Sequence, residues 1–365
     1  MNEKMMKTIG IIIGAFVVFI IIIFLMSKCG KGSHSYKQLV DRMVKEAKSY
    51  YKSNEKELPT EDKDTATLTL KKMISDERIP ELSEYLGKED AKCDGYVTVI
   101  NNSGYYLYIP TLTCGKDYQT KTLKDQIIEN SIVEKGVGLY QVNDEYIFKG
   151  EVKDNYVKLG EDLYRIIRIN TDGSIKLIGL DKSNYYVWDN RYNADINHND
   201  GINEFIYNNL NSRIKDSLEE LYKSDKYTDD YKSHIVSQDL CVGKRSEEDT
   251  TKDGSTECAQ KVTGQNLGLI AVYEYLQASL SPSCEKPTDY GCKNYNWLSD
   301  FNTWSITASA DKSSKVWKVA EEIYTTTASN TGKIAPTIVI NDLTVYEEGT
   351  GTETDPYIIT LGKKK

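Results

Sequence analysis

The sequence predicts an α+β protein with a transmembrane helix at its N-terminus. Three observations predict this fold class: an uncharged apolar stretch at Ile9–Met26, helical apolar stripes in several later segments, and pairs of alternating apolar runs separated by turn residues. A chain of 365 residues is long enough for about two domains beside the anchor. We therefore expect a membrane segment followed by two domains that each combine helices and strands.

The apolar stretch Ile9–Met26 has the length of a membrane span. At about 1.5 Å of rise per residue it would extend roughly 27 Å, close to the hydrocarbon thickness of a bilayer. A cleaved signal peptide is the alternative, but the stretch is longer than the usual apolar region and no small-residue cleavage pattern follows it. We interpret residues 1–30 as a cytoplasmic tip and an uncleaved signal-anchor.

The cysteines decide the orientation, because lysines flank the apolar stretch on both sides and leave the positive-inside rule nearly balanced. Six cysteines follow as close pairs, an arrangement that favours disulfides and an oxidising exterior. Among the many connectivities that six cysteines allow, we expect neighbours to pair: Cys93 with Cys114, Cys241 with Cys258, and Cys284 with Cys292. We therefore expect a single-pass protein of the cell membrane whose later domains are extracytoplasmic.

Cys29 remains outside these pairs. Lys28 precedes it, which does not resemble a lipoprotein cleavage site. We interpret Cys29 as a thiol beside the membrane or as one half of an intermolecular disulfide, in preference to a lipidation site.

The first domain is predicted from residues 35–114. Residues 35–54 carry one apolar stripe at helical spacing, and residues 95–100 and 105–109 read as two strands joined by the turn Asn101–Gly104. Cys93 precedes the first strand and Cys114 follows the second. A disulfide across this hairpin is therefore expected.

This region resembles the globular part of type IV pilins and pseudopilins. The likeness rests on Ala47–Tyr51, Leu58-Pro59 and Cys93–Val97, covers about residues 5–115, and implies a small α/β domain at 31–116. A linker that contains a short helix at about 121–130 is expected at 117–144. Pilin precursors carry a Glu five residues into the apolar stretch, whereas Thr8–Met26 contains none, so we use the likeness for shape and not for fibre assembly.

The second domain begins near residue 145 with strands and turns. Apolar runs at 163–169 and 175–180 flank Asp172-Gly173, a strong hairpin signal. Helices are expected at 203–222 and 267–278, with a polar surface loop at 243–258 between them.

The end of the chain resembles bacterial extracellular domains with a C-type-lectin-like fold, which are distantly related to the sulfatase-modifying (formylglycine-generating) scaffold. The matching segments are Trp297–Ser299, Val316–Val319, Gly332 and Pro336–Ile340, together with the hairpin at 164–178 and the expected helix at Leu210-Asn211. The likeness implies this fold for residues 145–365. It does not choose a function, because the fold serves many unrelated activities.

An aromatic surface is the first candidate site. Trp304, Trp188, Tyr185 and Tyr186 can form a platform for a glycan or a peptide, because aromatic residues are frequent in binding hot spots. Trp304 lies in a polar run and is the better candidate for an exposed contact, whereas we expect Trp297 and Trp317 to be core residues.

A calcium site is the second candidate. Its ligands would come from a stretch rich in hard oxygen donors, namely Asp195, Asn197, Asn199, Asp200 and Glu204. The Gly that follows falls one residue later than in an EF-type loop. An Asn-rich turn that caps the next helix is therefore the preferred interpretation, and no cofactor is expected.

Composition restricts the classes of function. The net charge of −9 argues against a nucleic-acid partner, whose binding requires Lys and Arg. The three His residues lie in no signature of nucleophilic catalysis, and no active-site cysteine pair of the formylglycine-generating type can be matched. We expect a non-enzymatic binding or adhesion protein for a glycan or a cell-surface protein. The alternatives are a pseudopilin-like structural component and, less favoured, an enzyme of the sulfatase-modifying scaffold.

Overall fold

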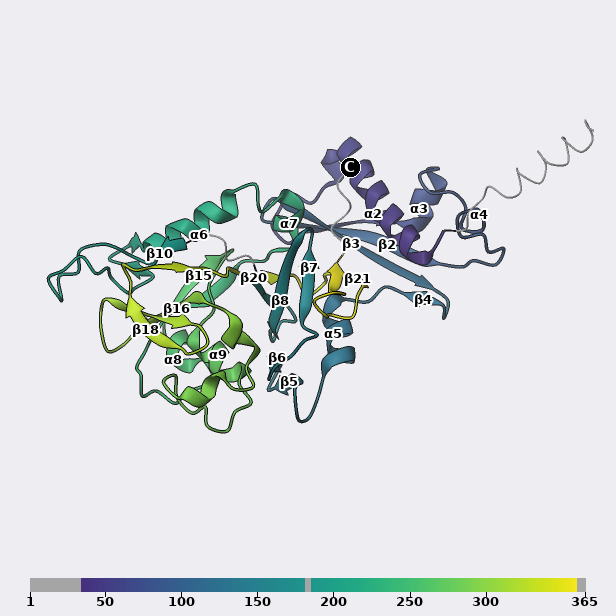
Figure 1. Ribbon diagram of the computed structural model, residues 1–365. Coiled ribbons are helices and arrows are strands. Elements are labelled where there is room, and N and C mark those ends of the chain that lie inside the picture. The colour runs from purple at the N-terminus through teal and green to yellow at the C-terminus, as the bar shows by residue number, and fades with distance from the viewer. Residues whose placement is uncertain (1–33, 181–184, 360–365) are drawn as a thin grey trace, which may run out of the picture. The chain divides into compact units, whose positions relative to one another are not determined.

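A computed structural model describes residues 34–180 and 185–359 of the chain (Figure 1). The expected signal-anchor Ile9–Met26 and Cys29 lie outside the described residues. Within the part that is described, none of the helices has the length and apolar character needed to cross a membrane. Helices and strands are mixed throughout, which confirms the α+β class.

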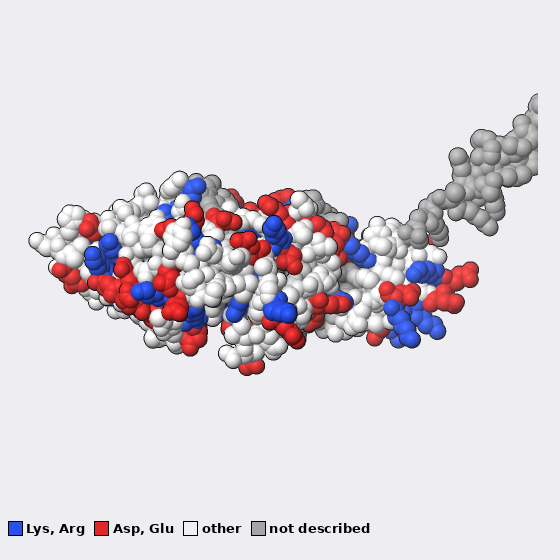
Figure 2. All heavy atoms as spheres, turned by 60° about the horizontal axis from the view of Figure 1, so that its bottom comes forward, with Lys and Arg blue, Asp and Glu red and all other residues white. Residues whose placement is uncertain are grey.

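The chain divides into two compact units. The first contains the described residues up to Glu55 together with Thr67–Thr98 and Pro110–Gln119. The second contains Lys56–Ala66, Val99–Ile109 and the described residues from Thr120 onward. Figure 2 shows acidic and basic side chains interspersed over one face of the molecule.

The first unit is organised by helix α2 (Tyr36–Ser53). Ser35 caps this helix in a capping box, because its hydroxyl accepts from the Gln38 backbone at 3.2 Å while the Gln38 side chain accepts from the Ser35 backbone at 2.8 Å. The predicted apolar stripe is buried, including Leu39, Met43 and Ala47. Two short helices follow, α3 (Leu70–Ser75) and α4 (Leu82–Leu86).

A four-stranded sheet has the order β1-β2-β3-β4. Its strands are β1 (Thr65–Thr69), β2 (Asp94–Asn102), β3 (Tyr105–Cys114) and β4 (Tyr118–Gln119). The predicted hairpin is confirmed, with Ser103 and Gly104 at its turn at positive φ. The Cys93–Cys114 disulfide closes it, as expected.

The second unit is built on an eight-stranded sheet. The order is β20-β9-β8-β7-β22-β21, and β6 pairs with both β5 and β8. The bounds are β5 (Gly138–Val142), β6 (Glu145–Lys149), β7 (Tyr156–Leu159), β8 (Asp162–Ile169), β9 (Ile175–Gly179), β20 (Thr337–Ile340), β21 (Tyr346–Glu348) and β22 (Tyr357–Ile359). The β8–β9 hairpin predicted at Asp172-Gly173 is confirmed, with Gly173 at a φ of +84°.

A second sheet has the order β14-β16-β17-β18. Its strands are β14 (Lys244–Arg245), β16 (Thr303–Ser309), β17 (Lys315–Val319) and β18 (Tyr324–Thr327). Trp297 and Trp317 lie in the core with 2% and 0% of their surface exposed, as predicted.

Shorter elements complete this unit. The strand pairs are β10 (Tyr185–Val187) with β19 (Thr331–Lys333), β11 (Ile206–Tyr207) with β12 (Leu210–Asn211), and β13 (Gln238–Cys241) with β15 (Lys261–Gln265). The helices are α5 (Leu123–Ser131), α6 (Arg213–Lys223), α7 (Asp229–His234), α8 (Ser255–Cys258) and α9 (Val272–Ala278). Single 3₁₀ turns lie at Glu55–Glu57, Tyr290–Lys293 and Trp297–Asp300.

Three expectations about local structure require correction. The helix expected from residue 203 begins at Arg213, because Asn208 and Asn209 both adopt left-handed φ angles and form the turn of the β11–β12 hairpin. The helix expected from residue 267 begins at Val272, after an extended segment that includes a β-bridge from Gly268 to β20. The stretch 117–144, expected as a linker, carries the expected short helix as α5, but Leu123 and Ile127 are fully buried and the stretch also contains β5, so from Thr120 onward it is part of the second unit.

Gly160 illustrates a position where only glycine fits. It lies in the β7–β8 turn at a φ of +59°, and a Cβ atom there would stand 1.6 Å from the Tyr231 hydroxyl oxygen. That oxygen accepts a hydrogen bond from the Glu161 backbone at 3.0 Å. The turn and helix α7 are therefore in direct contact.

Candidate ligand-binding pocket

The expected aromatic platform is not formed. Trp304 and Trp188 are 1% and 0% exposed, and their indole nitrogens donate to the backbone oxygens of Tyr186 at 3.0 Å and Ser305 at 3.2 Å. The expectation of an exposed Trp304 is wrong, because every residue of β16 is buried and its polar residues find partners inside the protein. Tyr185 is 63% exposed and Tyr186 is half-buried, both on β10.

The residues proposed for calcium have other partners or point to solvent. Glu204 pairs with Lys244 at 2.8 Å, Asp200 contacts His198 at 2.7 Å, and the Asn197 side chain accepts from the Tyr192 hydroxyl. Asp195 and Asn199 are exposed. Over residues 34–180 and 185–359, no three His, Cys, Asp or Glu side chains gather closely enough to hold a metal ion.

A pocket of about 580 Å³ lies elsewhere in the second unit. Four segments form it: the β5–β6 hairpin with β6, the β8–β9 turn at Thr171, the loop at 252–253, and the end of α9. The side chains used below are Asp144, Glu145, Lys149, Lys252, Asp253 and Gln277. We call this cavity the Lys149 pocket.

A buried arginine orients two side chains of the Lys149 pocket. Arg168 on β8 is 5% exposed, and its guanidinium donates to Glu145 at 3.0 Å and to the Gln277 side-chain oxygen at 2.7 Å. Because a guanidinium has no acceptor, the oxygen of Gln277 must face it. The amide NH₂ of Gln277 is then left to donate towards the pocket.

Behind this layer lies a buried ionic cluster that holds α9. Glu274 is 1% exposed, pairs with Lys176 of β9 at 2.8 Å, and accepts from the Ala271 backbone at 2.9 Å. Burial alone would raise the pKa of Glu274, but the neighbouring Lys176 and Arg168 cations lower it below its usual range. The carboxylate is therefore kept charged, and it ties α9 to the large sheet.

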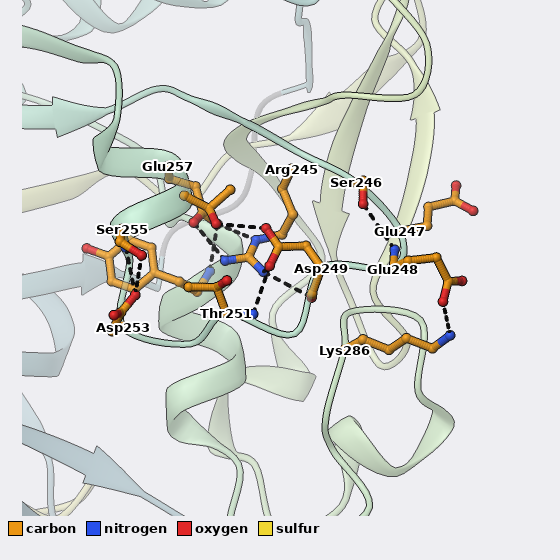
Figure 3. Close-up of polar contacts among 12 residues, drawn as sticks. Arg245, Ser246, Glu247, Glu248, Asp249, Thr251, Asp253, Ser255, Glu257 and Lys286 are labelled. Carbon is orange, nitrogen blue, oxygen red and sulfur yellow. Dashed lines mark hydrogen bonds and ion pairs between the residues drawn. The ribbon is translucent and has the colours of Figure 1, made fainter.

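The loop that carries Lys252 is held by a second buried ion pair (Figure 3). Arg245 and Glu257 are both fully buried and form two parallel hydrogen bonds of 2.8 Å each. Glu257 also accepts from the Tyr273 backbone at the start of α9, at 3.1 Å. The Cys241–Cys258 disulfide closes the same loop.

Lys252 is also fixed at its tip. Its ammonium donates to the carbonyl oxygen of Cys284, whose disulfide to Cys292 closes an adjacent loop. All three expected disulfides are thus confirmed, and two of them support the walls of the Lys149 pocket.

Lys149 is the half-buried cation of the pocket. Its ammonium lies 5.2 Å from the centre of the Tyr140 ring. Burial lowers the pKa of Lys149, and the nearby positive charge of Lys252 lowers it further. The two lysines therefore repel each other across the pocket, an arrangement that a negative ligand group would relieve.

The pattern of the sequence did not single out these residues. They come from four separate segments, and none belongs to a spaced motif. The one local signal is the polar loop at 243–258, whose flanking cysteines do predict a clamped loop. Comparison of the chain with protein-family models, with curated proteins and with solved structures gives no match.

Proposed function

We propose that this chain is a membrane-anchored extracytoplasmic binding protein that presents the Lys149 pocket to a glycan. In this proposal Ile9–Met26 is the signal-anchor, the first unit is a pilin-like stalk, and the second unit is a C-type-lectin-like head. Three disulfides support the extracytoplasmic location, because such bonds persist in oxidising compartments.

The polar lining of a rigid pocket is the observation that carries the proposal. Carboxylate, amide, ammonium and hydroxyl groups converge there, and each can exchange hydrogen bonds with sugar hydroxyls. The volume of about 580 Å³ lies within the range of small-molecule sites. Arg168 and the Arg245–Glu257 pair fix the lining from behind, so little side-chain entropy is lost on binding.

Glycan-array binding by the full chain in detergent tests the proposal. We expect binding to at least one glycan class, and we expect Thr171→Trp to abolish it, because an indole at this exposed edge would fill the pocket. Thr354→Trp is the matched control, since Thr354 is exposed and does not line the pocket. Absence of binding to any glycan would overturn the proposal, and unchanged binding by Thr171→Trp would place the glycan elsewhere.

A further inference from the structure

We infer that the Lys149 pocket selects glycans built from sugars with one carboxylate each, as in a uronic acid, and that Lys149, Lys252 and the Gln277 amide hold one such carboxylate. This inference rests on the proposed function and names its ligand class. Three hydrogen-bond donors, two of them charged, line one cavity. Bonds from charged donors to a carboxylate are among the stronger ones in proteins.

The donors are available to a ligand. Gln277 has its oxygen committed to Arg168, so its NH₂ group remains. Lys252 uses one of its three N–H bonds on the Cys284 carbonyl and keeps the other two. Among the residues that the structure describes, neither Lys149 nor Lys252 forms an ion pair with a carboxylate, although the charge of Lys252 is close enough to Asp289 to help lower the pKa of that carboxyl.

The acidic residues of the lining limit the bound sugar unit to one negative charge. Glu145 is neutralised by Arg168 at 3.0 Å. Asp253 accepts from the Ser255 backbone at 2.9 Å and from its hydroxyl at 2.6 Å, and these bonds lower the pKa of Asp253 and keep it ionised. Asp144 is exposed at the rim. A dianionic phosphate would meet these charges, whereas the hydroxyls beside a sugar carboxylate can donate to them.

Matched probes separate the carboxylate from the rest of the glycan. Oligogalacturonate and its methyl ester share the same sugar backbone and differ at the carboxyl groups, which are anionic in the acid and neutral methyl esters in the other. Binding of each to the full chain in detergent is measured by calorimetry near neutral pH. We expect the acid to bind at least about tenfold more tightly, equivalent to roughly 1.4 kcal/mol. Lys149→Gln and Lys252→Gln are each expected to lose about tenfold for the acid and little for the ester.

Lys153→Gln is the matched control, because Lys153 is exposed and lies outside the lining. Equal binding of acid and ester, or unchanged binding by both pocket variants, would overturn the carboxylate inference while the proposed function stands. So would tighter binding of a glycerol-phosphate polymer than of oligogalacturonate, or binding of neutral array glycans alone. If no glycan binds at all, the proposed function itself fails.

Discussion

Replacing Arg245 by Met is expected to lower the free energy of unfolding of the second unit by about 3–5 kcal/mol. Both charged groups of the Arg245–Glu257 pair are fully buried, so removing one leaves the other without a counter-charge in a medium of low polarity. Glu257 would keep only its bond from the Tyr273 backbone. The unpaired carboxylate of Glu257 thus accounts for most of the expected loss of stability.

Removing both charges tests this reasoning. In the double variant Arg245→Met/Glu257→Gln, the Gln oxygen can still accept from the Tyr273 backbone, and neither fully buried charge of the pair remains. The partly buried Asp249 carboxylate loses its 3.6 Å contact with Arg245 in both variants, but it keeps its bonds from Thr251 and Thr256. We expect the double variant to recover about 2 kcal/mol relative to Arg245→Met, since a buried ion pair and a neutral replacement often differ little in stability. Lys158→Met, which breaks the exposed pair with Glu161, is the control and should change stability by about 0–1 kcal/mol.

Denaturant unfolding followed by tryptophan fluorescence measures the stability of the second structural unit. All four Trp residues belong to the second unit, and the Trp317 indole donates to the Arg245 backbone oxygen at 3.2 Å. A loss below about 1 kcal/mol for Arg245→Met would show that the pair contributes no more than a surface pair. A double variant less stable than Arg245→Met would contradict the unpaired-charge explanation.

Three further predictions follow from the same unit. In the same unfolding assay, Gly160→Ala should destabilise the second unit by clearly more than Gly264→Ala. Both glycines have a positive φ, so Ala at either position costs about 1–2 kcal/mol of backbone strain. Only at Gly160 would the added Cβ also clash with the Tyr231 hydroxyl. Equal losses of stability in the two variants would show that the Tyr231 side chain moves away from residue 160 at no cost. Replacing Cys241 and Cys258 by Ser should lower the free energy of unfolding by about 3 kcal/mol. It should also weaken binding of oligogalacturonate, and unchanged affinity would mean that the disulfide does not position Lys252. Burial and Lys252 lower the pKa of Lys149, and its charged form is the one that binds the carboxylate. Calorimetry between neutral and alkaline pH should therefore show the affinity for oligogalacturonate falling as the pH rises through that pKa. Lys149→Arg should make the affinity less dependent on pH, because a guanidinium stays charged over this range.

Short sequence signals correctly predicted the elements that form between neighbouring residues, namely the hairpins and the disulfides. The Asp172-Gly173 and Asn101–Gly104 turns specified their hairpins, because left-handed backbone conformations favour such residues. Short separations brought each cysteine to its neighbour. The prediction for Trp304 was wrong because polarity along β16 was interpreted as exposure, whereas the hydroxyl of Thr303 donates to the Trp304 backbone oxygen at 3.2 Å inside the protein.

The Asn208-Asn209 turn shows a signal that was present and misinterpreted. Apolar residues recur at helical spacing through this region, but two consecutive Asn residues favour a tight turn over a helix interior. The helix therefore starts only at Arg213, where Ser212 caps it by accepting from the Lys215 backbone. Side-chain hydrogen bonding near the backbone decided between the two structures.

By itself, the sequence determined the α+β class, the paired cysteines and the main hairpins, because periodicity, turn chemistry and short loops act over few residues. Only the tertiary structure decided the Lys149 pocket. Pairing of β6 with β8 places Glu145 near Arg168, and the Glu274–Lys176 pair sets α9 so that Gln277 reaches the same arginine. The contacts of Gln277 with Arg168 and of Glu274 with Lys176 join residues about a hundred positions apart. Buried charges enforce them, because each charge would be costly to leave unpaired.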